Sequence, residues 1–268
     1  MIGAICGDIC GSIYEFNNNK SKDIILFDEN CRFTDDSVMT IAVFKALQDC
    51  NGNFENLTQT ATKRMREFGE KYLRVGYGNS FFNWILSTDP QPYNSWGNGA
   101  AMRISPVAYF AKNLEDLRFL SKKVTEITHN HPEGIKGAEA VATCVWLART
   151  GKTKEEIKNY VEKNYYSLDY DYEELKENYT FKVSCQNSVP QAIFCFLISN
   201  SFEDCLRTSI SIGGDSDTIS AISCSIAEAF YGIPKQFEEK SQEFLDDDLR
   251  AIAKEMINFR DKKIERSK

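Results

Sequence analysis

Two short acidic segments, far apart in the chain, combine carboxylates with threonine hydroxyls at the start of apolar stretches. The first is Thr34-Asp35-Asp36-Ser37, and the second is Gly213-Gly214-Asp215-Ser216-Asp217-Thr218. Carboxylates crowded in this way repel one another, and an all-oxygen ligand set favours a hard cation such as Mg²⁺, Mn²⁺ or Ca²⁺. If the fold brings the segments together, four carboxylates and two hydroxyls can bind a pair of such ions.

A helix N-cap is the simpler interpretation of each acidic segment taken alone. Asp, Ser and Thr are the preferred N-cap residues, and acidic groups suit the positive end of the helix dipole. A cap needs only one side-chain oxygen, however, and each segment supplies more than one. The presence of two such segments in one chain therefore favours a metal site.

The elements that must position these segments are predicted to be helices. Apolar residues recur at helical spacing, and no strong alternation of period two appears. The predicted helices are 37–49, 57–68, 100–112, 116–129, 137–150, 154–165, 189–198, 202–210, 219–231 and 235–260. Pro190 is placed in the first turn of its helix, segment 166–182 is a loop with one short helix, and 261–268 is a charged, frayed tail. With six prolines and no Pro/Gly/Ser-rich linker, the sequence predicts one all-α domain over residues 1–268, a compact multi-helix bundle.

Composition excludes several classes of protein. The net charge of −7 argues against a dedicated binder of nucleic acid or anionic membranes. No run of 18 apolar residues is present, and the apolar start of the chain lacks a basic segment, so neither a membrane span nor a signal peptide is expected. The nine cysteines form no C-x-x-C pair and indicate reduced, buried thiols in a cytoplasmic protein. With only two histidines, no zinc site is expected.

Glycine-rich segments are further candidates for a site. Gly3, Gly7 and Gly11 share one face of a helix and predict close packing against a neighbour, and Glu15 follows at the helix end. The loops 76–79 and 95–103 are ordinary turns in the simpler interpretation, but a glycine loop before a helix can also cradle a diphosphate. His129 and His131 either cap a helix or lie at the edge of a substrate site.

Several of these segments, in this order, resemble the ADP-ribosylglycohydrolase family, which includes the dinitrogenase-reductase activating glycohydrolases and the animal ADP-ribosyl-acceptor hydrolases. The matching stretches are Gly7-Asp8, Gly11-Ser12, Glu15-Phe16, Phe33 to Thr40, Gly76-Tyr77-Gly78, Gly97-Asn98-Gly99-Ala100-Ala101-Met102-Arg103, Thr128-His129 and Gly213 to Thr218. The resemblance runs from residue 1 to about residue 234. The Thr-Asp-Asp and Gly-Gly-Asp-x-Asp-Thr elements in this order are highly specific.

The resemblance implies an all-α bundle with a dinuclear Mg²⁺ or Mn²⁺ centre at the base of an ADP-ribose cleft. The implied metal ligands are Thr34, Asp35, Asp36, Asp215, Asp217 and Thr218. The implied catalytic residues are Glu15, which approaches the metals, and Asp35, Asp36 and Asp217. The implied substrate contacts are Gly76, Tyr77, Gly78, Gly97, Asn98, Gly99, Ala100 and His129. Because some members have Ser or Gly in place of Ala100, one hydroxyl contact to the diphosphate is expected to be missing.

The implied reaction is hydrolysis of the glycosidic bond between ADP-ribose and an acceptor. The partner is an ADP-ribosylated protein, with arginine as the favoured acceptor, or a small ADP-ribose conjugate. Serine, O-acetyl and nucleobase linkages remain open, as does a non-catalytic homologue that binds ADP-ribose or serves as a structural protein. The run from Asp215 to Thr218 also resembles the Asp-x-Asp motif of haloacid-dehalogenase phosphatases, which requires a preceding strand. We expect a monomer.

Overall fold

The computed structural model describes residues 1–265, and the secondary structure in this range is helical. The strand-like pairing in this range is limited to one isolated bridge between Gly97 and Ser184. The predicted all-α fold is confirmed, and the phosphatase alternative is excluded because residues 1–265 offer no strand before Asp215. The helices are α1 (Ile2–Gly11), α2 (Asp35–Asp49), α3 (Leu57–Lys71), α4 (Asn79–Leu86), α5 (Gly99–Met102), α6 (Val107–Phe110), α7 (Leu114–Thr125), α8 (Pro132–Arg149), α9 (Lys154–Asn164), α10 (Tyr172–Asn178), α11 (Cys185–Ile198), α12 (Phe202–Ser211), α13 (Ser216–Tyr231), α14 (Lys235–Glu243) and α15 (Asp247–Glu265).

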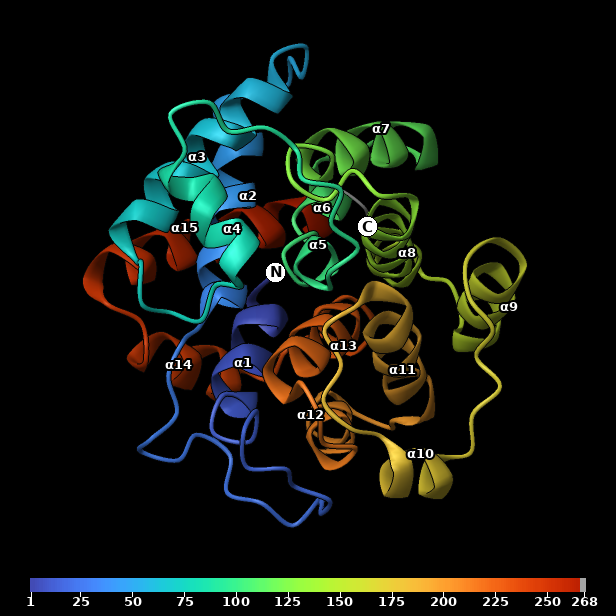
Figure 1. Ribbon diagram of the computed structural model, residues 1–268. Helices are drawn as coiled ribbons and strands as arrows, with labels where there is room; N and C mark the ends of the chain where they lie inside the picture. The colour runs from blue at the N-terminus through green and yellow to red at the C-terminus, as the bar shows by residue number, and fades with distance from the viewer. Residues whose placement is uncertain (266–268) are drawn as a thin grey trace.

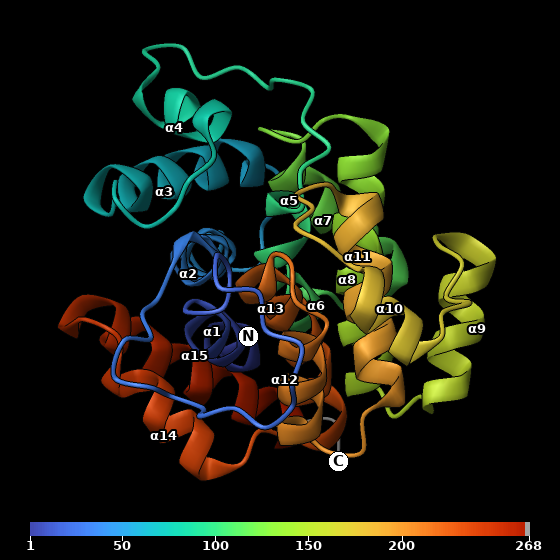
Figure 2. The same cartoon turned by 60° about the horizontal axis from the view of Figure 1, so that its bottom comes forward.

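Helices α1 and α13 lie side by side at the centre of the molecule (Figure 1). Helices α2, α3 and α4 lie on one side of this pair, and α8, α9 and α11 lie on the other, a division that Figure 2 shows from a second direction. Helix α1 also packs against α2. Since α2 and α13 each begin at one of the acidic segments, α1 is the element that joins the two halves of the site.

The glycine face of α1 permits this arrangement. A Cβ atom built on Gly3 or Gly7 would lie 2.2 Å from a backbone carbonyl oxygen of α13. On Gly11 it would lie 2.6 Å from the Cα atom of Asp217. These distances are far below van der Waals contact, so no residue with a side chain fits. The predicted close packing is confirmed, and it brings the backbone of α1 against the first turns of α13.

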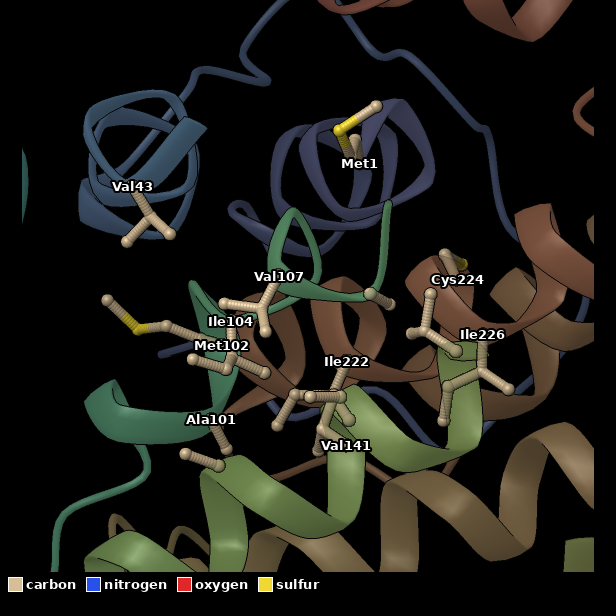
Figure 3. Close-up of a cluster of buried hydrophobic side chains, with 14 of the residues drawn as sticks. Met1, Val43, Ala101, Met102, Ile104, Val107, Val141, Ile222, Cys224 and Ile226 are labelled. Carbon is tan, nitrogen blue, oxygen red and sulfur yellow. The ribbon is translucent and has the colours of Figure 1, made fainter. Parts of the chain in front are cut away.

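A hydrophobic core lies where α13 packs against α8 and the segment 101–107. Figure 3 shows Val141 of α8, Ile222 and Ile226 of α13, and Ile104 and Val107 of the 101–107 segment gathered in one cluster. All five are fully buried, and burial of one such side chain stabilises the fold by about 1.5–3 kcal/mol. This core packs α8, α13 and the segment after the Gly97–Gly99 loop against one another.

The segment predicted as one helix over 100–112 is instead two single turns, α5 and α6. Pro106 stands between them, at the N-cap of α6. Proline lacks a backbone N–H and disfavours the helical conformation of the residue before it. The prediction is wrong here because helical spacing of apolar residues does not reveal the break that this proline imposes.

Three other boundaries differ from the prediction. Pro190 lies inside α11 rather than in its first turn, because the helix already begins at Cys185, whose N–H donates to the carbonyl of Trp96 over 2.9 Å. The helix predicted over 235–260 is divided into α14 and α15, since Asp246 accepts from the N–H of Leu249 and starts a new helix. The tail predicted to fray over 261–268 is helical through Glu265, and residues 266–268 lie outside the described part.

The remaining predictions hold with small shifts. Helices α8 and α13 begin a few residues before their predicted starts, and α10 is the short helix expected within 166–182. Helix α4 was missed, since its eight residues follow a glycine loop. The nine cysteines are free, and all but Cys50 are buried, as predicted. Among residues 1–265, no helix is both long and apolar enough to cross a membrane.

Candidate active site

The fold brings the two acidic segments into direct contact. The hydroxyl of Thr218 donates to Oδ2 of Asp36 over 3.2 Å. Two sets of three carboxylates have oxygens within 4.8 Å of one another, namely Asp8, Asp36 and Asp217, and Glu15, Asp215 and Asp217. Asp217 belongs to both sets, so the two groups share one carboxylate and form a continuous acidic centre.

Helix capping does not account for these carboxylates. The N-cap of α2 is Thr34, whose Oγ1 accepts from the N–H of Asp36 over 3.3 Å. Asp215 is the N-cap residue of α13 but makes no capping bond with its side chain. Among the four aspartates, only Asp217 bonds a first-turn N–H, that of Thr218, with Oδ1. Capping therefore does not account for Asp35, Asp36 or Asp215, whose carboxylates are available as ligands.

Asp8 is the main participant that the sequence reasoning did not select as a site residue. It lies fully buried in α1 and accepts hydrogen bonds from the N–H groups of Thr34 and Ser37, at 2.9 and 3.1 Å, and from both hydroxyls. It therefore fixes the start of α2 against α1. A lone acidic residue inside an apolar, glycine-rich helix was the available signal, because a buried charge requires partners.

Burial dominates the electrostatics of the centre. It raises the pKa of Asp8, despite the hydrogen bonds from Ser37 and Thr34, and the pKa of Asp215, each to about 6. Burial and then the charge of Asp217 raise the pKa values of Asp35 and Asp36 well above the usual range. Oδ1 of Asp36 is buried without a hydrogen-bond partner. Repelling carboxylates with an orphaned oxygen are the donor set that a divalent cation fits.

Glu15 lies beside this centre in the turn after α1, which ends at Gly11. Its side chain is half-buried. Burial, followed by the charge of Asp217, raises the pKa of Glu15 to about 8. A carboxyl group with such a pKa can hold or release a proton near neutral pH, which suits a role in acid–base chemistry.

The acidic centre forms the floor of a cleft of about 490 Å³. The sequence-predicted residues that line it are Glu15, Asp35, Asp36, Gly76, Gly78, Gly97, Asn98, Gly99, His129, Asp215, Asp217 and Thr218. Thr34, Tyr77 and Ala100 are not among the lining residues: Thr34 lies beneath, bonded to Asp8, and Ala100 is fully buried. The amide of Asn98 donates to Asp215 over 2.6 Å, which ties the cleft wall to the acidic floor.

Gly76 is required by its position in the wall. Its φ of +116° is a conformation that side-chain-bearing residues rarely adopt. A Cβ atom there would also lie 2.9 Å from Oδ1 of Asp35. The glycine thus lets the loop approach the acidic floor.

Other residues of the cleft were not selected from sequence. They are Phe16, Met39, Asn79, Ser80, Phe81, Tyr93, Ser95, Met102, Arg103, Phe181 and Val183. Phe16, Met39, Met102 and Arg103 lie within matched motifs, and Asn79 and Ser95 lie in the candidate glycine loops, so the sequence did contain a signal for them. Phe181 and Val183 come from an irregular loop, and their place at the cleft depends on the pairing of that loop with residues 96–98.

Comparison with known proteins agrees with this geometry. The family model for ADP-ribosylglycohydrolase matches residues 1–265. The chain is 25% identical to ADP-ribosylhydrolase ARH3 of Mus musculus, over 94% of this chain and 88% of that protein, and 24% identical to the Homo sapiens protein of that name, over 94% and 90%. It is also 25% identical to ADP-ribosylarginine hydrolase Tri1 of Pseudomonas putida, over 64% of this chain and 47% of that protein.

A solved structure described as an ADP-ribosylglycohydrolase-related protein complex superposes with a TM-score of 0.69 at 19% identity, covering 94% of both chains. This similarity supports the fold. The chain belongs to the ADP-ribosylglycohydrolase family. It is a hydrolase that acts on glycosidic bonds of ADP-ribose.

Metal binding should stabilise the protein, and more strongly at high pH. Because the folded-state pKa values of the buried aspartates are raised, the metal-free folded protein binds more protons than the unfolded chain, and its stability falls as pH rises from about 4 through 6 and above. A cation at about 100 times its Kd adds ~2.7 kcal/mol per site, which corresponds to about 5–10 °C in Tm. Melting curves with EDTA and with Mg²⁺, at about pH 5.5 and about pH 8, test this. Equal Tm values in EDTA and Mg²⁺ at both pH values would contradict the metal site.

Proposed function

We propose that this protein is a metal-dependent hydrolase that removes ADP-ribose from arginine side chains of proteins, with Mg²⁺ or Mn²⁺ at the acidic centre. The observation that carries the proposal is the contact between the two acidic segments at the floor of a cleft. The residues that would hold the cations are Thr34, Asp35, Asp36, Asp215, Asp217 and Thr218. A bound pair of cations would offset the repulsion among these carboxylates and supply Lewis-acid chemistry to the ribose.

Two other parts of the cleft would bind the substrate and transfer a proton. Gly76, Gly78 and the Gly97–Gly99 loop form walls of the cleft, against which the diphosphate of ADP-ribose would lie, and at Gly76 a side chain would press against Asp35. Glu15 lies next to Asp217 at the acidic centre, where the glycosidic bond would be cleaved. With its pKa raised to about 8 by burial, Glu15 is suited to handle the proton that hydrolysis moves from water to the leaving group.

Two aromatic residues beside Glu15 favour arginine as the acceptor. Phe16 and Phe181 stack with ring centroids 5.9 Å apart, line the cleft, and expose 79% and 46% of their surface. A guanidinium group is weakly hydrated, stacks on aromatic faces and pairs with carboxylates. Serine offers neither charge nor a planar face. The Pseudomonas putida relative named as an ADP-ribosylarginine hydrolase is consistent with this proposal.

Loss of one ring should weaken hydrolysis of the arginine linkage selectively. A cation–π contact in a partly desolvated site is worth about 1–2 kcal/mol, so Phe181→Ala should lower kcat/KM for an arginine-ADP-ribosylated peptide about tenfold. Phe181→Tyr should retain most of the activity. Phe119→Ala, which removes a comparably exposed phenyl ring outside the cleft, is the matched control.

The substrates to compare are arginine- and serine-ADP-ribosylated peptides and O-acetyl-ADP-ribose, each with Mg²⁺, Mn²⁺ or EDTA. Metal-dependent release from the arginine peptide alone is the expected result. Preference for serine or O-acetyl linkages would contradict the acceptor. Metal-dependent binding of ADP-ribose without release from any substrate would contradict the proposed catalytic role.

A further inference from the structure

A buried arginine forms the inner wall of the cleft without a carboxylate bound to it. The Arg103 side chain is 1% exposed and lines the cleft. Its Nη2 donates to the neutral hydroxyl of Thr128 over 2.6 Å, and its Nε is buried without a hydrogen-bond partner. Its guanidinium lies over the ring of Phe81, 5.5 Å from the centroid. Burying a cation in this way is costly, which indicates a role for Arg103 beyond packing.

The hydrogen bond from Arg103 occupies one acceptor position of the Thr128 hydroxyl and limits where its proton can point. Because Thr128 Oγ1 accepts from Arg103, its single proton can go either to the carbonyl of Thr125, at 3.4 Å, or to Nδ1 of His129, at 2.8 Å. Hydroxyl donors bond their acceptors at 2.5–3.0 Å. The contact to Nδ1 has this length and the contact to Thr125 does not. The distances therefore favour donation from the hydroxyl to Nδ1 over the alternative, in which Nδ1–H donates to Oγ1 and the hydroxyl makes only the long contact to Thr125.

Donation from Thr128 to Nδ1 goes with one tautomer of His129. A neutral imidazole that accepts at Nδ1 carries its proton on Nε2. Burial, followed by the charge of Arg103, holds the pKa of His129 well below its usual range, so the ring stays neutral. The titratable and charged side chains around the ring include Arg103 and Tyr93, whose own pKa is raised to about 12 by burial. Neither changes charge near neutral pH.

Nε2 of His129 faces the glycine loop of the cleft. A Cβ atom on Gly97 or on Gly99 would lie 3.4 Å from Nε2, so both glycines leave this nitrogen accessible. His129 itself lines the cleft.

We propose that Arg103 is a positioning residue that, through the Thr128 hydroxyl, holds His129 in the Nε2–H tautomer and presents it to the cleft as a neutral hydrogen-bond donor. The bond that results joins Nε2–H to an anionic oxygen of the substrate. The identity of that oxygen rests on the proposed function, whereas the tautomer does not.

The tautomer is measured by NMR of the ¹⁵N-labelled imidazole rings. The chain has two histidines, His129 and His131, so His131→Gln assigns the signals. We expect the wild-type His129 to show a protonated Nε2 and an unprotonated, hydrogen-bonded Nδ1, with no titration between about pH 5.5 and about pH 8. A protonated Nδ1, or titration of His129 near its ordinary pKa, would overturn the inference.

Variants of Thr128 and Arg103 test whether the tautomer of His129 affects hydrolysis of the substrate. Thr128→Val removes the hydroxyl but keeps the shape, and should convert His129 to a mixture of tautomers and lower kcat/KM about tenfold. Thr128→Ser should restore both the single tautomer and the activity. Arg103→Met should also mix the tautomers. If Arg103→Met does not fold, Thr128→Val and Thr128→Ser still decide the question.

A His129 tautomer that does not change in Thr128→Val would contradict the inference. The NMR readout needs no substrate. Failure of ADP-ribose release with the expected tautomer would therefore contradict the proposed function and leave the inference standing.

Discussion

Asp217→Asn should lower ADP-ribose release at least about 1,000-fold while raising the Tm of the metal-free protein. Asp217 is the carboxylate shared by both acidic sets. Loss of a ligand to catalytic cations removes several kcal/mol of transition-state stabilisation, and each 1.36 kcal/mol corresponds to about tenfold in rate. The opposite effect on stability follows because asparagine relieves the repulsion that Asp217 exerts on Asp35 and Asp36.

Asparagine is a close replacement at this position. It retains an Oδ1 that can accept from the N–H of Thr218, a bond of 2.9 Å in the native protein. Each kcal/mol of relieved repulsion should raise Tm in EDTA by about 2–4 °C. The stabilisation by Mg²⁺ should shrink at the same time.

The measurements are the rate of ADP-ribose release with Mg²⁺ and melting curves with EDTA and with Mg²⁺. Asp169→Asn, which removes the same charge from an exposed position outside the cleft, is the control and should match the native protein in both. Native activity in Asp217→Asn would show that Asp217 does not take part in the reaction. A variant whose Tm in EDTA falls would show that the carboxylate stabilises the fold.

Gly7→Ala should destabilise the protein by at least about 3 kcal/mol, at the upper end of the cost of overpacking a core. The added Cβ would lie 2.2 Å from the carbonyl oxygen of Ser220 and 2.7 Å from the N atom of Ala221. Both are backbone atoms of α13, so no side-chain rotation relieves the clash and the two helices must move apart. The expected loss in Tm is about 6–12 °C.

The same substitution should also weaken metal binding. Asp8 follows Gly7 directly and holds Thr34 and Ser37 at the start of α2, so a displacement of α1 separates the two acidic segments. The Tm shift caused by Mg²⁺ should therefore be smaller than in the native protein. Gly78→Ala is the control, since Gly78 has a φ of −61° and nothing within 4 Å of an added Cβ. Its stability should stay within about 0.5 kcal/mol of native. A Gly7→Ala protein with native Tm would contradict the close packing of α1 on α13.

Local sequence determined the helices and the acidic segments of this protein. Apolar spacing predicted most helices because that signal depends on residues three and four apart. The crowding of carboxylates at 34–37 and 213–218 indicated a cation site because repulsion between adjacent side chains exists before any folding. The glycine face of α1 likewise predicted close packing, since the absence of side chains along one helix face is a property of the sequence itself.

Tertiary structure decided which residues surround the acidic centre. The role of Asp8 depends on α2 lying against α1, and no spacing along the chain encodes that contact. The contributions of Phe181 and Val183 depend on a loop that pairs with residues 96–98, and the assignment of the His129 tautomer depends on Arg103 reaching Thr128. The break at Pro106 and the early start of α11 at Cys185 show the same limit. Most of these features arise from contacts between segments that are distant in sequence, and the break at Pro106 arises from a local preference that competes with helical spacing. The helical period of apolar residues carries no information about either cause.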